Sequence, residues 1–88
     1  MDQDDSLFSF PCDFPVKVMG AAAPDFDSMV VALVRKHSPD ISEGAVTTRL
    51  SPGGRYMAVT VTIQAQSRAQ LDSIYRDLTA ESRVLVAL

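Results

Sequence analysis

The chain has 88 residues, 47% of them hydrophobic, and a formal net charge of −3. This length predicts one domain with one core, and no apolar stretch approaches the roughly 20 residues needed to cross a bilayer. The acidic balance gives no general attraction to nucleic acid or to an anionic membrane. The acidic start, Met1–Asp5, and a single cysteine, Cys12, favour the reducing cytoplasm, where we expect the protein to reside.

The N-terminal part of the chain divides into a tail and the start of a sheet. We expect residues 1–9 to be a disordered acidic tail and residues 10–88 to form the domain. Two prolines at the start of the domain exclude helix and favour extended chain. The first strand is predicted at about residues 16–20, with Lys17 and Met19 facing outward.

A first helix follows a loop of small residues. Pro24 fits the first helical position, where a missing N–H is not needed. Pro39 prevents the helix from continuing beyond His37. The predicted helix carries a single apolar face at helical spacing, made of Phe26, Met29, Val30, Leu33, Val34 and His37.

Two strands joined by a hairpin come next. Ala45–Ser51 alternates weakly and reads as an edge strand, and Pro52–Gly54 supplies the turn. Arg55–Gln66 alternates over its whole length, which predicts a strand with one buried face. The residues expected to face the core are Met57, Val59, Val61, Ile63 and Ala65.

The C-terminal part predicts a helix and a last strand. Ser67 and Gln70 match a capping box, so a helix should begin there and end near Ala80. Ser82–Leu88 is apolar and alternating, and reads as a strand. Two helices must cover one face of a four-stranded sheet. The simplest solution is the ferredoxin-like α+β fold, βαββαβ, with an antiparallel sheet in the order 4-1-3-2.

Three segments resemble the YbeD-like family of small bacterial proteins of unknown function: Phe14–Gly20, Arg35–Pro39 and Ser51–Tyr56. The likeness covers about residues 8–88. It implies a ferredoxin-like fold similar to the ACT-type regulatory domains of amino-acid metabolism, and with it an allosteric or adaptor role. The Ala21–Ala23 run departs from this pattern, because it removes polar side chains from the loop where an ACT-type domain would hold a ligand.

Catalysis has little support in the sequence. The only histidine, His37, lies on the apolar helix face, where we expect it to pack its ring and interact with the negative end of the helix. One histidine and one cysteine at no meaningful spacing do not make a metal site. We therefore expect no enzyme activity, no metal and no cofactor.

The sheet face left open by the helices is the main candidate for binding. It is expected to expose Met19, Tyr56, Ala58, Thr60, Thr62, Leu85 and Ala87. This surface is moderately apolar, and such patches often mark an interface with a protein partner or with a second copy of the chain. The alternative is a threonine-rich face left in water. RNA is not expected, because RNA-binding sheets stack bases on several aromatic rings and this face has one.

A second candidate is an anion site where the first helix begins. Arg49, Arg55 and Arg83 are expected to meet there and hold a carboxylate or phosphate of a metabolite or an acidic partner. The alternative is that Asp25 and Asp27, in the same turn, already neutralise these arginines. The predicted function is a small regulatory or protein-interaction module, with an ACT-like sensor of small anionic metabolites as the alternative. The candidate binding residues are Lys17, Met19, Gly20, Arg49, Arg55, Tyr56, Arg83 and Leu85.

Overall fold

A computed structural model describes residues 9–88, so all but the last residue of the predicted tail lies outside the described residues. The elements are β1 (Cys12–Ala21), α1 (Phe26–Arg35), a short 3-10 helix η2 (Glu43–Ala45), β2 (Val46–Leu50), β3 (Tyr56–Ala65), α2 (Arg68–Ala80) and β4 (Val84–Ala87).

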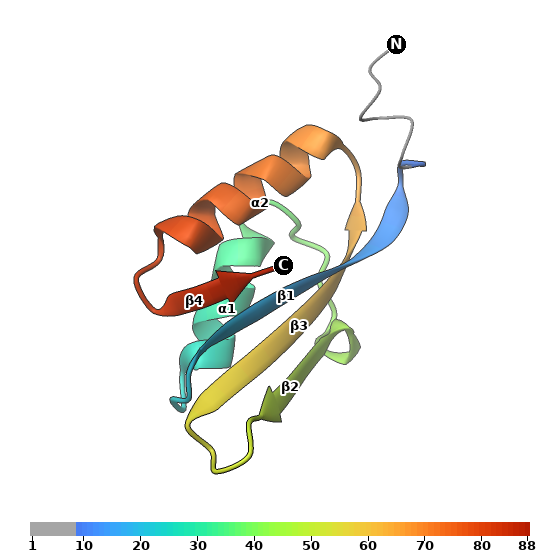
Figure 1. Cartoon of the computed structure of the whole chain (residues 1–88). Helices are drawn as coiled ribbons and strands as arrows, with labels where there is room; N and C mark the ends of the chain where they lie inside the picture. Colours follow the sequence, from blue (N-terminus) through green and yellow to red (C-terminus); the bar gives the residue numbers. More distant parts are fainter. Residues whose placement is uncertain (1–8) are drawn as a thin grey trace.

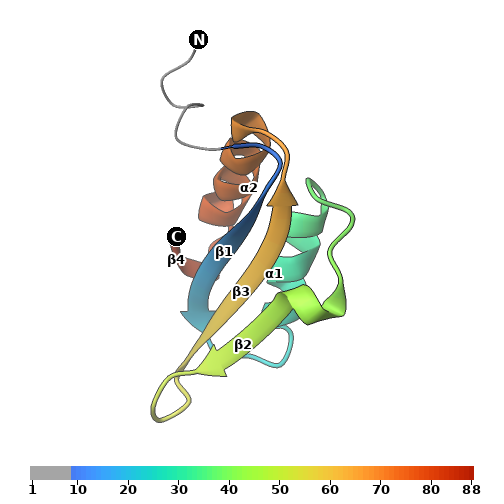
Figure 2. The same cartoon turned by 90° about the vertical axis from the view of Figure 1, so that its right-hand side faces the viewer.

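The four strands form one sheet in the order β2-β3-β1-β4, and every neighbouring pair is antiparallel. Both helices lie on one side of this sheet, with α1 behind β1 and β3 in Figure 1, and Figure 2 shows the two layers from the side. The predicted ferredoxin-like βαββαβ fold and its strand order are confirmed.

The core lies between the helices and the inner face of the sheet. β3 alternates as the sequence predicts, because Val59, Val61, Ile63 and Ala65 are buried and face the helices. The helices contribute Phe26, Val30, Val34, Leu71, Ile74 and Leu78. Burial of this apolar surface stabilises the two layers against each other.

The ends of α1 differ from the prediction. The helix begins at Phe26 and not at Pro24, because the N–H of Phe26 bonds the carbonyl of Ala23 in a preceding turn. The helix also ends at Arg35, one turn before Pro39. α2 begins where predicted, and the Ser67 hydroxyl accepts the N–H of Gln70 at 3.0 Å.

β1 is twice as long as predicted, because the strand begins at Cys12 and includes Pro15. The N–H of Lys17 points toward β4 and bonds the carbonyl of Leu88. Pro15 lies two residues earlier in β1, so its backbone nitrogen points to the same side as that of Lys17. No residue of β4 pairs with Pro15 there. Its missing N–H therefore costs no ladder hydrogen bond.

A bulge in β4 changes which side chains face outward. Met19 pairs with Val86, but Gly20 pairs with Val84, so Leu85 is an extra residue. The prediction that Ala87 lies on the open face is wrong, because Ala87 pairs with Val18 and packs against the core.

Gly20 lies where the sheet meets the start of α1. A methyl group built on it would overlap the carbonyl of Arg83 and lie 2.5 Å from a ring carbon of Phe26. Gly20 is thus required for close packing, and it is buried rather than available to a ligand.

Candidate functional site on the open face of the sheet

The centre of the open face is a small grid of side chains from all four strands. Strand pairing places Thr47, Thr60, Lys17 and Leu88 in one row, and Arg49, Ala58, Met19 and Val86 in the next. Lys17 and Leu88 share a row because their backbones exchange two hydrogen bonds, at 3.1 and 2.7 Å.

The grid is hollowed along β3, because Ala58 and Thr60 have short side chains. One hollow, of about 340 Å³, lies toward β2 and is lined by Lys17, Thr47, Thr48, Arg49, Ala58 and Thr60. The other, of about 150 Å³, lies toward β4 and is lined by Lys17, Val18, Met19, Ala58, Thr60, Val86 and Leu88. The two hollows share Lys17, Ala58 and Thr60, so we treat them as one feature and call it the trough.

Exposed large hydrophobic side chains are concentrated on the sheet. Those of the described residues are Met19, Leu50, Tyr56, Leu85, Val86 and Leu88. Met19, Val86 and Leu88 line the trough, and Tyr56 follows on the same face of β3, opposite Ala21. The sequence predicted Leu85 on the open face, but Val86 is the residue that pairs with Met19 there. Leu85 remains exposed at the bulge but does not line the trough.

The trough is positively charged. Lys17 and Arg49 have no ion pair among residues 9–88. On the same face, β1 carries one carboxylate, Asp13, which lies four residues before Lys17 and therefore about 13 Å away along the strand. That separation exceeds the screening length at physiological salt.

The predicted cluster of three arginines does not form. Arg83 donates two hydrogen bonds to the carboxylate of Asp25, at 2.8 and 3.1 Å, and lies over the ring of Phe26. Arg49 is in the trough instead, because it pairs with Ala58 in the middle of the sheet. Arg55 is exposed in the hairpin, and its backbone carbonyl accepts the N–H of Ala22.

The Arg83–Asp25 pair leaves little positive charge for an external anion at the start of α1. Hydrogen bonds from Arg83 lower the pKa of Asp25, and the same bonds raise the pKa of Arg83. Each group is therefore stabilised in its charged form by the other.

His37 ties the end of α1 to α2. Its Nε2 lies 2.7 Å from a carboxylate oxygen of Asp77, and Lys36 contacts the same oxygen at 3.3 Å. The hydrogen bond from His37, followed by that from Lys36, lowers the pKa of Asp77. The sequence predicted a packed ring at the helix end but missed this partner, which lies 40 residues away.

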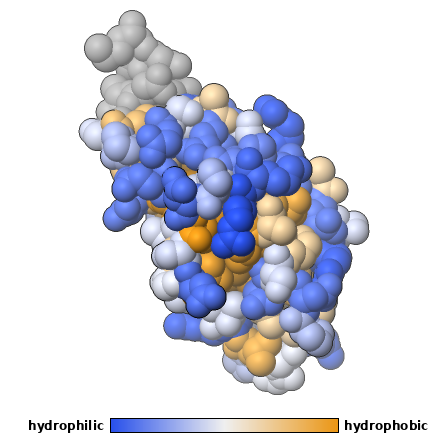
Figure 3. All heavy atoms as spheres, turned by 180° about the vertical axis from the view of Figure 1, so that it is seen from behind, coloured by the Kyte–Doolittle hydropathy of each residue, from blue (hydrophilic) through white to orange (hydrophobic). Residues whose placement is uncertain are grey.

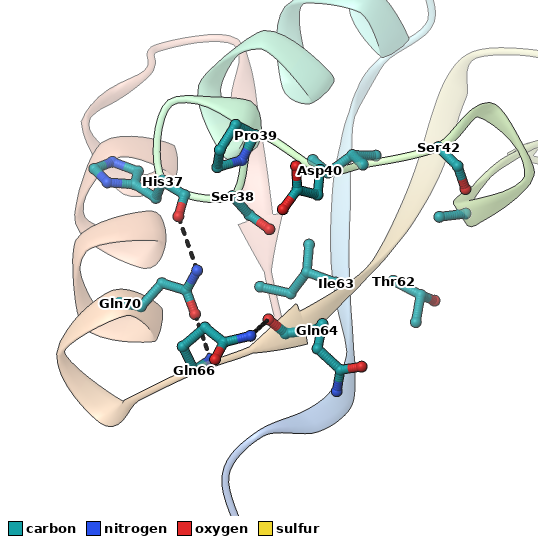
Figure 4. A pocket seen from close by; sticks show the side chains of 12 residues that line it. His37, Ser38, Pro39, Asp40, Ser42, Thr62, Ile63, Gln64, Gln66 and Gln70 are labelled. Atoms are coloured by element: carbon teal, nitrogen blue, oxygen red, sulfur yellow. Dashed lines mark hydrogen bonds between the residues drawn. The ribbon is translucent and has the colours of Figure 1, made fainter.

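A polar hollow of about 290 Å³ lies beside His37, between the loop after α1, the end of β3 and the start of α2 (Figure 4). Its amide groups already bind one another. Gln70 donates to the carbonyl of His37 and accepts the N–H of Gln66, and the Gln66 side chain donates to the carbonyl of Gln64. These hydrogen bonds connect the loop after α1, the end of β3 and the start of α2. The residues that line the hollow include no Lys or Arg that could bind an anionic ligand.

Viewed from the helix side, the molecule shows apolar atoms in a central hollow surrounded by polar residues (Figure 3). On this side a groove of about 470 Å³ separates α1 from β2. Its apolar residues are Val31 and Val46, and its other lining residues are Asp27, Ser28, Arg35, Ser42, Glu43 and Thr48. Charges of both signs line this groove, in contrast to the trough.

The chain matches a family model described as "Protein of unknown function (DUF493)" over residues 5–88. It belongs to this family. UPF0250 proteins of Paraburkholderia phytofirmans and Chromobacterium violaceum are 48% and 46% identical to it, with 97% and 99% of this chain and 96% and 98% of the relatives covered. The resemblance to YbeD-like proteins seen in the sequence is confirmed.

A solved structure extends the comparison of the DUF493 chain to three dimensions. The solution structure of HP0495 from H. pylori superposes with a TM-score of 0.70 over 92% of this chain and 85% of the other, at 12% identity. This likeness shows a shared α+β fold. No helix within residues 9–88 is long and apolar enough to span a membrane, and these residues contain no group of three or more candidate metal ligands.

Proposed function

We propose that this chain is a non-catalytic protein-interaction module that binds its partner through the open face of the sheet. The observation that carries this proposal is the location of the exposed large hydrophobic side chains. Within residues 9–88 they all lie on strands or directly after β4, and the helices contribute none. Four of them, Met19, Tyr56, Val86 and Leu88, lie close together on the open face, whereas Leu50 pairs with Met57 and lies on the opposite face of the sheet. Neighbouring exposed apolar side chains of this kind are typical of an interface.

A catalytic role has weaker support. His37 is held by Asp77, and no hydroxyl or thiol of residues 9–88 is hydrogen-bonded to its ring. Activation of a nucleophile by a histidine base needs such a pair. Sensing of a small anion also has weaker support, because Asp25 already binds Arg83.

The test is affinity purification from the native cell with the wild-type chain and with Met19→Glu combined with Val86→Glu. Both substituted residues are on the open face and exposed, so the variant should fold. Loss of the partner protein from the purified material is the expected result. Ala32→Glu with Ala69→Glu, on exposed helix positions, is the matched control and should bind normally. Equal profiles for all three proteins would contradict the proposal.

A further inference from the structure

The charge of the trough restricts the kind of partner. The whole chain is acidic, with 11 acidic and 8 basic residues. Yet two of these basic residues, Lys17 and Arg49, line the hollow above β3 with no ion pair among residues 9–88. Cations placed together in this way favour an anionic partner and steer its approach.

The shape of the trough favours an extended segment. β1 and β2 flank β3 at the usual strand spacing, so the walls formed by Met19 and Arg49 are about 10 Å apart. Short side chains, Ala58 and Thr60, form the floor between them. An extended peptide chain fits such a channel with its side chains directed alternately toward the two walls.

The two walls also differ in chemistry. Toward β2, Arg49 and the hydroxyl of Thr47 face the hollow, and Lys17 reaches it from β1. Toward β4, the lining is apolar and comes from Met19, Val86 and Leu88. A carboxylate suits the first side, where guanidinium and ammonium groups can donate charge-assisted hydrogen bonds, and an aliphatic or aromatic side chain suits the second.

A second copy of the chain does not fit this pattern. In a two-fold pairing of open faces, each copy would present the same two cations and no side-chain carboxylate within the trough. Like charges brought together across an interface oppose association.

We infer that the trough binds an extended acidic segment of a partner protein, with a carboxylate between Lys17 and Arg49 and a hydrophobic side chain against Met19, Val86 and Leu88. This inference rests on the proposed function, since it specifies the partner of the same face.

Selection from a random-peptide display library on the immobilised full chain tests the inference. Peptides rich in Asp or Glu together with Leu, Ile, Val or Phe should be recovered. Their affinity should fall about tenfold or more for Lys17→Glu combined with Arg49→Glu and should weaken with added salt. Arg55→Glu with Arg76→Glu changes the net charge equally outside the trough and is the matched control, so it should retain binding.

The possible failures are distinguishable. Recovery of peptides that carry no net negative charge, and whose binding is lost in Met19→Glu with Val86→Glu, would overturn the inference about charge. The proposal that the open face is an interface would remain. Recovery of no peptide sensitive to any open-face substitution would overturn both. Binding of a single-stranded RNA 20-mer that is lost in Lys17→Glu with Arg49→Glu would overturn the inference in favour of a phosphate ligand.

Discussion

Along β3, alternate residues face the helices and the solvent, and the two sets differ in size and in what surrounds them. Val59 and Val61 on the inner face are completely buried under α1 and α2. Ala58 and Thr60, between them in sequence, form the floor of a shallow trough with charged and apolar walls. One face therefore holds the domain together, whereas the other is the face that we propose binds a partner. Substitutions on the two faces should separate stability from binding.

The largest expected effect comes from a charge on the inner face. Val61→Asp places a carboxylate at a position with 0% exposure and no partner, which should cost more than about 4 kcal/mol and abolish cooperative unfolding. Thr60→Asp, one residue earlier on the open face, should cost about 1 kcal/mol or less. Urea denaturation measures both. A cooperative transition for Val61→Asp at the wild-type midpoint would show that the assigned strand face is wrong.

Gly20→Ala tests the close contact between the inner face and the start of α1. The added methyl group would overlap Arg83 and Phe26, so we expect a loss of about 1–3 kcal/mol in the free energy of unfolding. Gly44→Ala is the matched control, because a methyl group added there would have no neighbouring atom within 4 Å. It should be neutral or stabilising by up to about 1 kcal/mol. Equal stability of the two variants would contradict the packing described for Gly20.

The contacts of Asp77 in α2 with Lys36 and His37, just after α1, should give a smaller, pH-dependent effect. His37 and Lys36 lower the pKa of Asp77 below its ordinary value of 3.8. The native state therefore favours the carboxylate form more strongly than the unfolded state does. This contribution is complete above about pH 5 and is lost as the pH falls through the lowered pKa. The stability difference between wild type and Asp77→Asn should shrink below pH 3.8 in thermal unfolding scans. A difference that stays constant down to about pH 2 would contradict this assignment.

The smallest effect is expected from the cations of the trough. Lys17→Ala with Arg49→Ala removes two charges without ion pairs among the described residues, so the free energy of unfolding should change by less than about 0.5 kcal/mol. Arg83→Ala should cost more, because this guanidinium is bound by Asp25 and lies over Phe26. A large loss of stability in the first variant would mean that Lys17 and Arg49 support the fold.

The sequence was sufficient for the fold because its signals are local. Alternation along β3, the Ser67 cap and the apolar face of α1 each depend on residues close in the chain. The length of β1 could not be predicted in the same way, since Pro15 is tolerated only because β4 ends before it.

The site was only partly predictable. Met19, Tyr56 and Ala58 were correctly placed on the open face by alternation alone. The bulge at Leu85 could not be predicted from the sequence, because Leu85 and Val86 are both apolar and neither residue is typical of a turn. Arg49 was expected at the start of α1, but it lies in the trough. Its position depends on the register between β2 and β3, which could not be read from the sequence. The short side chains of Ala58 and Thr60 were the sequence signal that could have indicated the trough.

Backbone amide shifts test most directly whether the open face is the binding surface for an acidic segment. The full chain, labelled with ¹⁵N, would be titrated with an acidic and apolar peptide recovered by the selection. We predict shift changes centred on Lys17, Met19, Arg49, Ala58 and Val86, with little change around His37 or at Ala22–Phe26. Changes confined to either of those two regions, with the open face unaffected, would contradict the assignment of the trough as the binding site.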